Sequence, residues 1–442
     1  MSGHSTLITS DEYFSDSSIR ATPVWPEVAT YGVLLLLLYF AVGGMFSFEV
    51  GARNSAAGAA TAGISSSESA SSLLKERIIF LVLLFLTRSV WTELPSLLRR
   101  YVWVFVIVSS AIFSSVWSQD PRTTFAAGLR LLVGVFFVIY LFKRYSPQRL
   151  MRLLVMLGWL IGIASVGFAL LLPRFGIDNQ DAHGAWQGIF GHKNFCGYVL
   201  VFLMTPVFFL QRRGFIDQVQ RIAYCLFLSV IVVLSQSRTS WSLLFALFGL
   251  VAMFQVISRF RYRDAVVLSV CLFLAVGIVT WASFNFLPDL FVMMGKEATL
   301  NGRVEIWQPV MLSIMKHPLT GYGYCAFWRG LSGESGIIGS IVGWVPPHAH
   351  NGFLNVALQV GFPGLVVLLI AWLVGMREAI RRFRMGERQE AGWYLTLLML
   401  NIVVNISEPT LLFYNNLVWL MFLIACVGAG RTRSLIGSKD YS

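Results

Sequence analysis

The apolar residues of this chain are gathered into long continuous blocks, and these blocks limit what the chain can fold into. Residues 31–48, 150–172 and 265–284 are examples. Each block is long enough to cross a hydrocarbon core of about 30 Å as a helix. Helices are expected because every backbone amide inside lipid must be paired locally, and because runs such as LLLLLYF show no strand-like alternation. The predicted fold class is therefore all-α, a polytopic inner-membrane helical bundle.

Composition agrees with this class. Of the 442 residues, 56% are hydrophobic and 13% are charged, whereas a typical soluble domain carries roughly 25% charged residues. Residues 1–27 are polar and lack the basic-then-apolar order of a cleavable signal peptide, so we expect the first helix to be retained. The five cysteines show neither CxxC nor metal-type spacing, and no disulfide framework is predicted.

Taken in order, the apolar blocks predict about twelve helices, of which the second is interrupted by Arg88. The expected ranges are 29–48, 78–97, 101–117, 124–142, 150–172, 195–211, 222–236, 240–258, 265–285, 353–375, 391–405 and 415–430. An Ala/Gly/Ser-rich stretch over 56–72 is expected to be a flexible linker. The predicted domains are a cytoplasmic tail (1–27), a transmembrane domain (28–430) and a second cytoplasmic tail (431–442).

The basic residues indicate how the chain is oriented. Every second connection between the predicted helices is rich in Lys and Arg, as in 143–149 and 377–388. Basic loops stay in the cytoplasm, so these connections and both termini are expected inside. The net charge of +12 is thereby explained by orientation, and nucleic acid is not a predicted partner. Arg382, in one of these basic loops, is assigned only an orienting charge.

The longest of the intervening, outward-facing loops spans 286–352, and loops of this length usually carry function. Within it, the segment RVEIWQPVMLSIM places four residues on one helical face, namely Ile306, Val310, Ser313 and Ile314. This pattern predicts an amphipathic helix over 303–315, lying at the membrane interface inside an ordered cap.

A few cations stand on the outward side, where the charge rule predicts none. Arg238 lies in SQSRTSW, in a tight connection between two predicted helices, and Arg303 opens the amphipathic helix after Asn-Gly. A helix N-terminus also favours an anion. These cations indicate an anionic ligand at the outer leaflet, and the diphosphate of lipid-linked sugars is the expected one. The alternative is that each arginine bonds loop carbonyls or lipid headgroups. Lys193 and His192, in GHKN, are secondary candidates.

The histidine with the strongest chemical case is His350, in VPPHAHNGFLNV. It opens the next helix together with Asn351, and Gly352 would let a substrate approach closely. An imidazole can take a proton from a hydroxyl near neutral pH, although capping a helix or bonding a headgroup is the alternative role. His348 and His350 form an H-x-H pair with no carboxylate or cysteine nearby in the sequence to complete a tetrahedral zinc site, so no metal is predicted.

These motifs, taken together, resemble the O-antigen ligase and polysaccharide polymerase superfamily. The matching pieces occur in the family's order over about 110–425: SSVWSQDPRTT, GIFGHKNFCG, SQSRTSW, NGRVEIWQPVMLSIMKHPLTGYGYCAFW and HAHNGFLNVALQVGFPG. Among the branches, the chain is most like the exopolysaccharide polymerases of the lipid-linked repeat-unit pathway.

The resemblance implies an inverting glycosyltransferase that needs neither metal nor cofactor and uses an undecaprenyl-diphosphate-linked glycan at the periplasmic face. By the same resemblance, Arg238 and Arg303 bind the diphosphate and His350 activates the acceptor hydroxyl. A copolymerase and a flippase are the expected partners. An O-antigen ligase acting on lipid A core is the alternative within this chemistry. A transporter is the alternative from another class, but it would more typically carry inverted repeats with charges near the membrane midplane.

The charge pattern gives a testable topology. A reporter active only in the periplasm is expected to work when fused after residue 330 and to fail when fused after residue 385, because the second site lies in a basic loop. A cytoplasmic reporter should give the opposite pattern. Reversal at either position would contradict the placement of the candidate residues.

Overall fold

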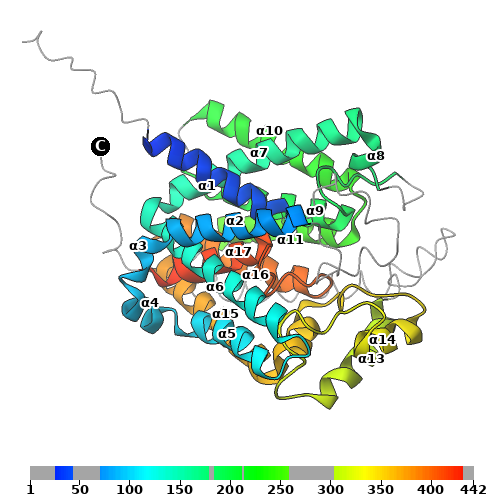
Figure 1. The fold of residues 1–442 in the computed structure, drawn as a ribbon. Helices are drawn as coiled ribbons and strands as arrows, with labels where there is room; N and C mark the ends of the chain where they lie inside the picture. The colour runs from blue at the N-terminus through cyan, green and yellow to red at the C-terminus, as the bar shows by residue number, and fades with distance from the viewer. Residues whose placement is uncertain (1–24, 43–69, 179–183, 212–213, 258–302, 432–442) are drawn as a thin grey trace, which may run out of the picture.

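The computed structural model describes residues 25–42, 70–178, 184–211, 214–257 and 303–431. The regular secondary structure of this part is helical, joined by turns and loops, apart from one isolated antiparallel bridge between Ile177 and Trp186. Figure 1 shows the helices in a single bundle, with α13 and α14 in a smaller cap at one end. Their bounds are α1 (Trp25–Val42), α2 (Ala70–Leu86), α3 (Arg88–Trp91), α4 (Leu94–Arg100), α5 (Val102–Phe113), α6 (Pro121–Arg144), α7 (Pro147–Leu171), α8 (Pro173–Gly176), α9 (Lys193–Met204), α10 (Phe215–Leu234), α11 (Arg238–Ile257), α13 (Arg303–Lys316), α14 (Gly333–Val342), α15 (Gly352–Arg384), α16 (Arg388–Asn405) and α17 (Leu417–Gly430).

The described helices make the chain a membrane protein. By length and composition, α6, α7, α10, α11 and α15 can each cross a membrane, and α4 with α5 would add a sixth span bent by 101°. α1, α9 and α17 are apolar but shorter. The predicted helix over 265–285, most of the 56–72 linker, residues 1–24 and the tail from 432 onward lie outside the described residues. The predicted all-α class is confirmed for the part that is described.

The second predicted helix differs from the structure. It begins earlier than expected, at Ala70, and ends at Leu86, and the short helices α3 and α4 follow. Thr87 marks the break, where its hydroxyl donates to the Leu83 carbonyl at 2.9 Å. Such back-bonding bends helices, and the adjacent Arg88 must carry its charge out of an apolar block.

The centre of the bundle is α17, which Figure 1 shows among α1, α6, α15 and α16. Its sequence is apolar on every side, and its residues are almost entirely buried. A helix of that kind belongs in the interior of a bundle. Gly428 allows the close crossing with α16, because a Cβ there would lie 2.5 Å from the Tyr394 ring. Small residues at such crossings are typical of membrane helices.

Arg130, which lies inside α6, has a structural partner. Its guanidinium pairs with the Glu76 carboxylate at 2.8 Å and donates to the Tyr414 hydroxyl at 3.1 Å. These contacts join α2 and the segment before α17 to α6. An ionisable pair that satisfies itself in this way holds helices together inside a membrane protein.

The predicted amphipathic helix is confirmed as α13. The side chains of Ile306, Val310, Ser313 and Ile314 are all buried, as the pattern indicates. They pack with α14 and α15 in a second hydrophobic core, so this face contacts protein instead of lipid. The opposite face of the cap is also apolar, with Leu312, Met315 and Ile341 exposed.

α15 connects the two polar ends of the bundle. Its 33 residues form two helical stretches that meet at a kink. Gly361 interrupts it with a φ of +71°, and a Cβ there would lie 2.5 Å from the Leu319 backbone. α15 begins beside His350 and ends at a second polar cluster.

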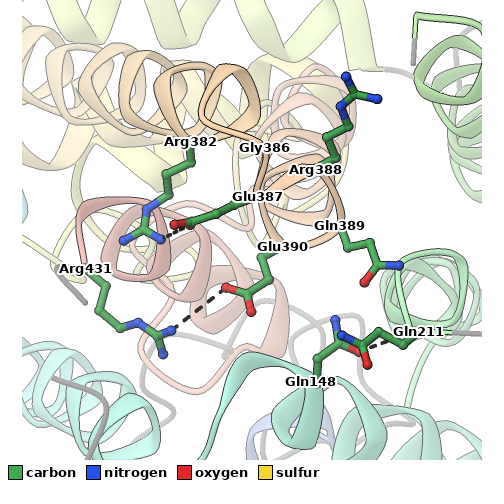
Figure 2. A pocket seen from close by; sticks show the side chains of 9 residues that line it. All are labelled: Gln148, Gln211, Arg382, Gly386, Glu387, Arg388, Gln389, Glu390 and Arg431. Atoms are coloured by element: carbon green, nitrogen blue, oxygen red, sulfur yellow. Dashed lines mark hydrogen bonds and ion pairs between the residues drawn. The ribbon is translucent and has the colours of Figure 1, made fainter. Parts of the chain in front are cut away.

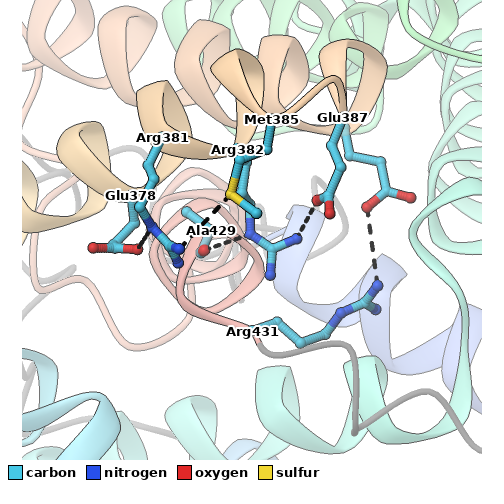
Figure 3. A network of polar contacts seen from close by, with 8 residues as sticks. Glu378, Arg381, Arg382, Met385, Glu387, Ala429 and Arg431 are labelled. Atoms are coloured by element: carbon cyan, nitrogen blue, oxygen red, sulfur yellow. Dashed lines mark hydrogen bonds and ion pairs between the residues drawn. The ribbon is translucent and has the colours of Figure 1, made fainter.

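The polar cluster at the far end of α15 is an ion-pair network that joins α15, α16 and α17. Arg382 is 6% exposed, donates from Nε to the Ala429 carbonyl at 2.7 Å and pairs with Glu387 at 2.5 Å (Figure 3). Arg431 pairs with Glu390 at 3.9 Å, and the same groups line a cavity of about 470 Å³ (Figure 2). The expectation that Arg382 carries only an orienting charge is wrong, because α17 and α16 enclose its side chain.

This network predicts a stability effect. Arg382→Ala leaves the Glu387 carboxylate and the Ala429 carbonyl without their cationic partner, so we expect the free energy of unfolding to fall by roughly 2 to 5 kcal/mol. Thermal unfolding in detergent measures the change. The matched control is Arg381→Ala, whose side chain is 56% exposed and pairs with Glu378 outside the bundle (Figure 3). Equal unfolding temperatures for the two variants would contradict the structural role of Arg382.

Candidate functional site

The segment after α16, residues 406–416, gathers side chains from three other helices. The Asn351 amide of α15 donates to the Ile406 carbonyl at 3.2 Å. The Thr239 hydroxyl of α11 bonds the Ser407 hydroxyl at 3.0 Å. The Asn194 amide of α9 donates to Glu408 Oε1 at 2.9 Å. Ile406, Ser407 and Glu408 are consecutive, so this one segment places the first turns of three helices side by side.

His348 and His350 stand directly at the start of α15. Their rings lie 4.2 Å apart, and the His350 backbone N–H donates to His348 Nδ1 at 3.2 Å. The Trp344 ring lies 6.0 Å from the His350 ring. His350 holds a φ of +47°, a left-handed conformation that residues with a side chain seldom adopt. Such strained positions cluster at functional sites.

The predicted start of this helix is confirmed, and Gly352 allows close packing there. Asn351 caps α15 by accepting from the backbone N–H groups of Phe353 and Leu354. A Cβ on Gly352 would lie 2.0 Å from Oδ1 of Asn405 in α16. The close approach that Gly352 permits in the structure is to α16, and the expected substrate contact at this glycine stays a prediction.

Arg238 is exposed at the first position of α11. Gln236, two residues earlier, has a φ of +51° and turns the chain tightly between α10 and α11. Behind Arg238, the Ser240 hydroxyl donates to the Ser237 hydroxyl at 2.8 Å, and both serines are buried. The tight connection expected from the sequence is confirmed, and it keeps Arg238 beside Thr239 and hence beside the 406–416 segment.

Lys193 opens α9 in the same region. His192 is the cap of this helix, with its Nδ1 accepting from the Asn194 backbone N–H at 3.2 Å. The capping role accounts for one ring nitrogen of His192. Its neighbour Lys193 lies next to Asn194, whose side-chain amide donates to Glu408.

The start of α13 is tied to the same place. α13 begins at Arg303, whose side chain lies outside the described residues. One turn later, Trp307 Nε1 donates to the carbonyl of Ala349 at 3.0 Å, and Ala349 lies between the two histidines. Four helix N-termini, those of α9, α11, α13 and α15, thus meet around the histidine pair. Each N-terminus carries a partial positive charge, which favours an anion.

Two comparisons found known proteins to which this chain is similar. Residues 223–369 match the O-antigen ligase family. The chain is also 26% identical over 313 residues to the exopolysaccharide production protein ExoQ of Rhizobium meliloti (strain 1021), covering 67% of this chain and 69% of the relative. Residues 223–369 are therefore similar to the O-antigen ligase family. This confirms the resemblance drawn from the sequence motifs.

Most of the predicted site residues lie inside the range that matches this family. The matched range includes Arg238, Arg303, His348, His350 and Asn351 and leaves out Lys193 and His192. It also leaves out Glu408, Asn194 and the whole 406–416 segment. None of these was predicted from the sequence, because the predicted site consisted of cations, histidines and the residue beside them. The sequence does contain a signal for Glu408. It is an acidic residue in a short loop that is predicted to face outward, between two apolar blocks.

Glu408 also changes the argument about metal. The expectation that no carboxylate accompanies the H-x-H pair is wrong, since ligand atoms of His348, His350 and Glu408 all lie within 4.8 Å of one another. The protonation of His348 disfavours a metal here. Its Nδ1 accepts a backbone N–H, so the neutral ring carries its proton on Nε2 and has no lone pair free for an ion. His348, His350 and Glu408 are better suited to a chain of hydrogen bonds than to a metal ion.

Metal content can be measured directly. Protein purified without added metal is expected to contain far less than one zinc ion per chain by mass spectrometry, and a strong chelator should leave its unfolding temperature unchanged. One equivalent of zinc, lost in both His348→Ala and Glu408→Gln, would contradict this reading and establish a metal centre.

Proposed function

We propose that the chain polymerises polyprenyl-diphosphate-linked oligosaccharide repeat units into exopolysaccharide, by inverting, metal-independent glycosyl transfer at the periplasmic face of the inner membrane. The observation that carries this proposal is the convergence of four helix N-termini, with Arg238 and the backbone of Arg303 among them, around the histidine pair in a chain whose residues 223–369 match the O-antigen ligase family. In the membrane, undecaprenyl diphosphate would be the lipid carrier, and a copolymerase and a flippase the partners.

The donor diphosphate would bind where the positive charge is concentrated. Arg238 and Arg303 each offer a planar guanidinium that can contact two phosphate oxygens. The N-termini of α11 and α13 add partial positive charge at the same positions. These groups would stabilise the negative charge that develops on the diphosphate as it leaves, a role that metal ions fill in other enzymes.

The acceptor would be activated by His350. Its ring takes the proton of the acceptor hydroxyl while that oxygen forms a bond to the anomeric carbon. The bond from this carbon to the diphosphate oxygen breaks, and the electron pair leaves with the diphosphate. Attack and departure occur on opposite sides of the carbon, so the configuration inverts. The proton on the imidazole then passes to solvent.

A covalent route through a cysteine near this site is disfavoured. Cys325 lies in the cap between α13 and α14, and burial raises the pKa of its thiol to about 12. The thiol therefore stays protonated near neutral pH, whereas the thiolate is the nucleophilic form. Direct displacement fits this environment better.

The position of the candidate residues favours an enzyme over a transporter. They lie at the first turns of α9, α11, α13 and α15, at one end of the long helix α15. Substrate sites in transporters typically lie near the membrane midplane, between repeats. A polar site at one end of a bundle is suited to substrates that stay in a single leaflet.

The second candidate function is ligation of O-antigen to lipid A core, which the description of the matched family favours. The name of the ExoQ relative favours exopolysaccharide production. Both reactions use the same donor and the same displacement, so they differ only in the acceptor. Glycan analysis of a strain that lacks the gene separates them. Accumulated single repeats indicate a polymerase, and long unattached O-antigen indicates a ligase.

Variants expressed in that strain test the proposed roles. Arg303→Lys and Arg238→Lys keep the charge but lose the planar fork, so we expect little long polymer to be restored. His350→Ala removes the base, and transfer is expected to fall by roughly 10²- to 10⁴-fold while the lipid-linked donor still binds. Polymer length on gels and donor binding to purified protein give the two readouts.

The matched control is Arg381→Lys, an exposed residue at the opposite end of α15, which should restore polymer fully. Immunoblots of the membrane fraction must show equal amounts of every variant. Normal polymer from His350→Ala or Arg303→Lys would remove the proposed mechanism.

A further inference from the structure

Glu408 is the most deeply placed acidic group beside the histidine pair, and neither the family match nor the sequence motifs include it. It is 7% exposed. Its backbone N–H donates to the Val404 carbonyl at 2.8 Å, which holds the residue against the end of α16. Asn194 fixes one carboxylate oxygen. Removing a carboxylate from water costs several kcal/mol unless it is paired, so a buried acid at this place needs an explanation.

The surroundings of Glu408 supply that explanation. Its carboxylate lies within 4.8 Å of ring nitrogens of both His348 and His350. Because His348 accepts a backbone N–H at Nδ1, its proton is on Nε2 and can face the carboxylate. A carboxylate beside an imidazole also stabilises the imidazolium that forms when the ring takes a proton, and the effect is larger away from water.

Nδ1 of His350 is buried against the protein. The left-handed φ of His350 and the ring of Trp344 further restrict the orientation of the imidazole.

We infer that Glu408, held by Asn194, is the positioning residue for His350: its carboxylate lies beside the imidazole and stabilises the imidazolium that forms during transfer. This inference rests on the proposed transferase function. Glu408 does not itself meet the substrate. The proton moves from the acceptor hydroxyl to His350 alone, and the carboxylate stays ionised throughout.

The test compares single and double variants of the full-length chain in lipid nanodiscs, with the lipid-linked repeat unit extracted from cells as donor. Glu408→Gln keeps the shape and the oxygen that accepts from Asn194 but loses the charge. We expect kcat to fall by about 10- to 100-fold with an unchanged KM for the donor, a smaller loss than that of His350→Ala because the imidazole remains. Asn194→Ala, which frees the carboxylate from its clamp, should lower kcat in the same direction by a smaller factor.

The double variant gives the decisive comparison. If Glu408 acts through His350, then adding Glu408→Gln to His350→Ala should slow transfer no further, because the group it positions is already absent. The control is Glu334→Gln, which removes a carboxylate from the cap that pairs with Lys316, and it should leave kcat unchanged. Unfolding temperatures of all variants exclude loss of the fold as the cause.

The outcomes separate this inference from the proposed function. Full activity of Glu408→Gln, or an equal further loss in the His350→Ala background, would overturn the role of Glu408 while leaving the transferase proposal intact. Failure of the unaltered chain to form polymer from this donor would overturn both.

Discussion

The candidate site depends on how the side chain of Asn405 turns the chain after α16. Its Oδ1 accepts the backbone N–H groups of Thr410 and Leu411, and its Nδ2 donates to the Asn401 carbonyl and the Thr410 hydroxyl. In a protein interior, backbone groups outside helices must find such partners. Gly352 lets α15 start directly against this amide. The folded 406–416 segment then presents three consecutive residues to α9, α11 and α15.

The two ends of α15 show how similar groups serve different purposes. At one end, Arg382 and Arg431 pair with carboxylates across α15, α16 and α17, and these pairs hold the helices together. At the other end, Arg238 is exposed beside four helix N-termini, and the acidic group there lies next to imidazoles. Buried ion pairs hold helices of the bundle together, whereas a group of helix N-termini with a cation beside it favours an anionic ligand.

Several features were predictable because their causes are local. The length of an apolar block decides whether a helix can span lipid, and most predicted helices appear at nearly the predicted bounds. The period of Ile306, Val310 and Ile314 predicted their burial. The break near Arg88 was also visible in the sequence, although the early start of α2 was not.

The sequence by itself determined the all-helical class, the amphipathic face of α13, the tight connection that holds Arg238 and the placement of Arg303 and His350 at helix starts, because apolar length, periodicity and capping act over a few residues. Only the tertiary structure decided which of these starts meet. Asn194 and Glu408 lie 214 residues apart in the chain, and the pairing of their side chains follows from how α9 packs against α16 and α17. The burial of Arg382 and the neighbour of Gly352 were decided in the same way, since both depend on the side chains that other helices bring.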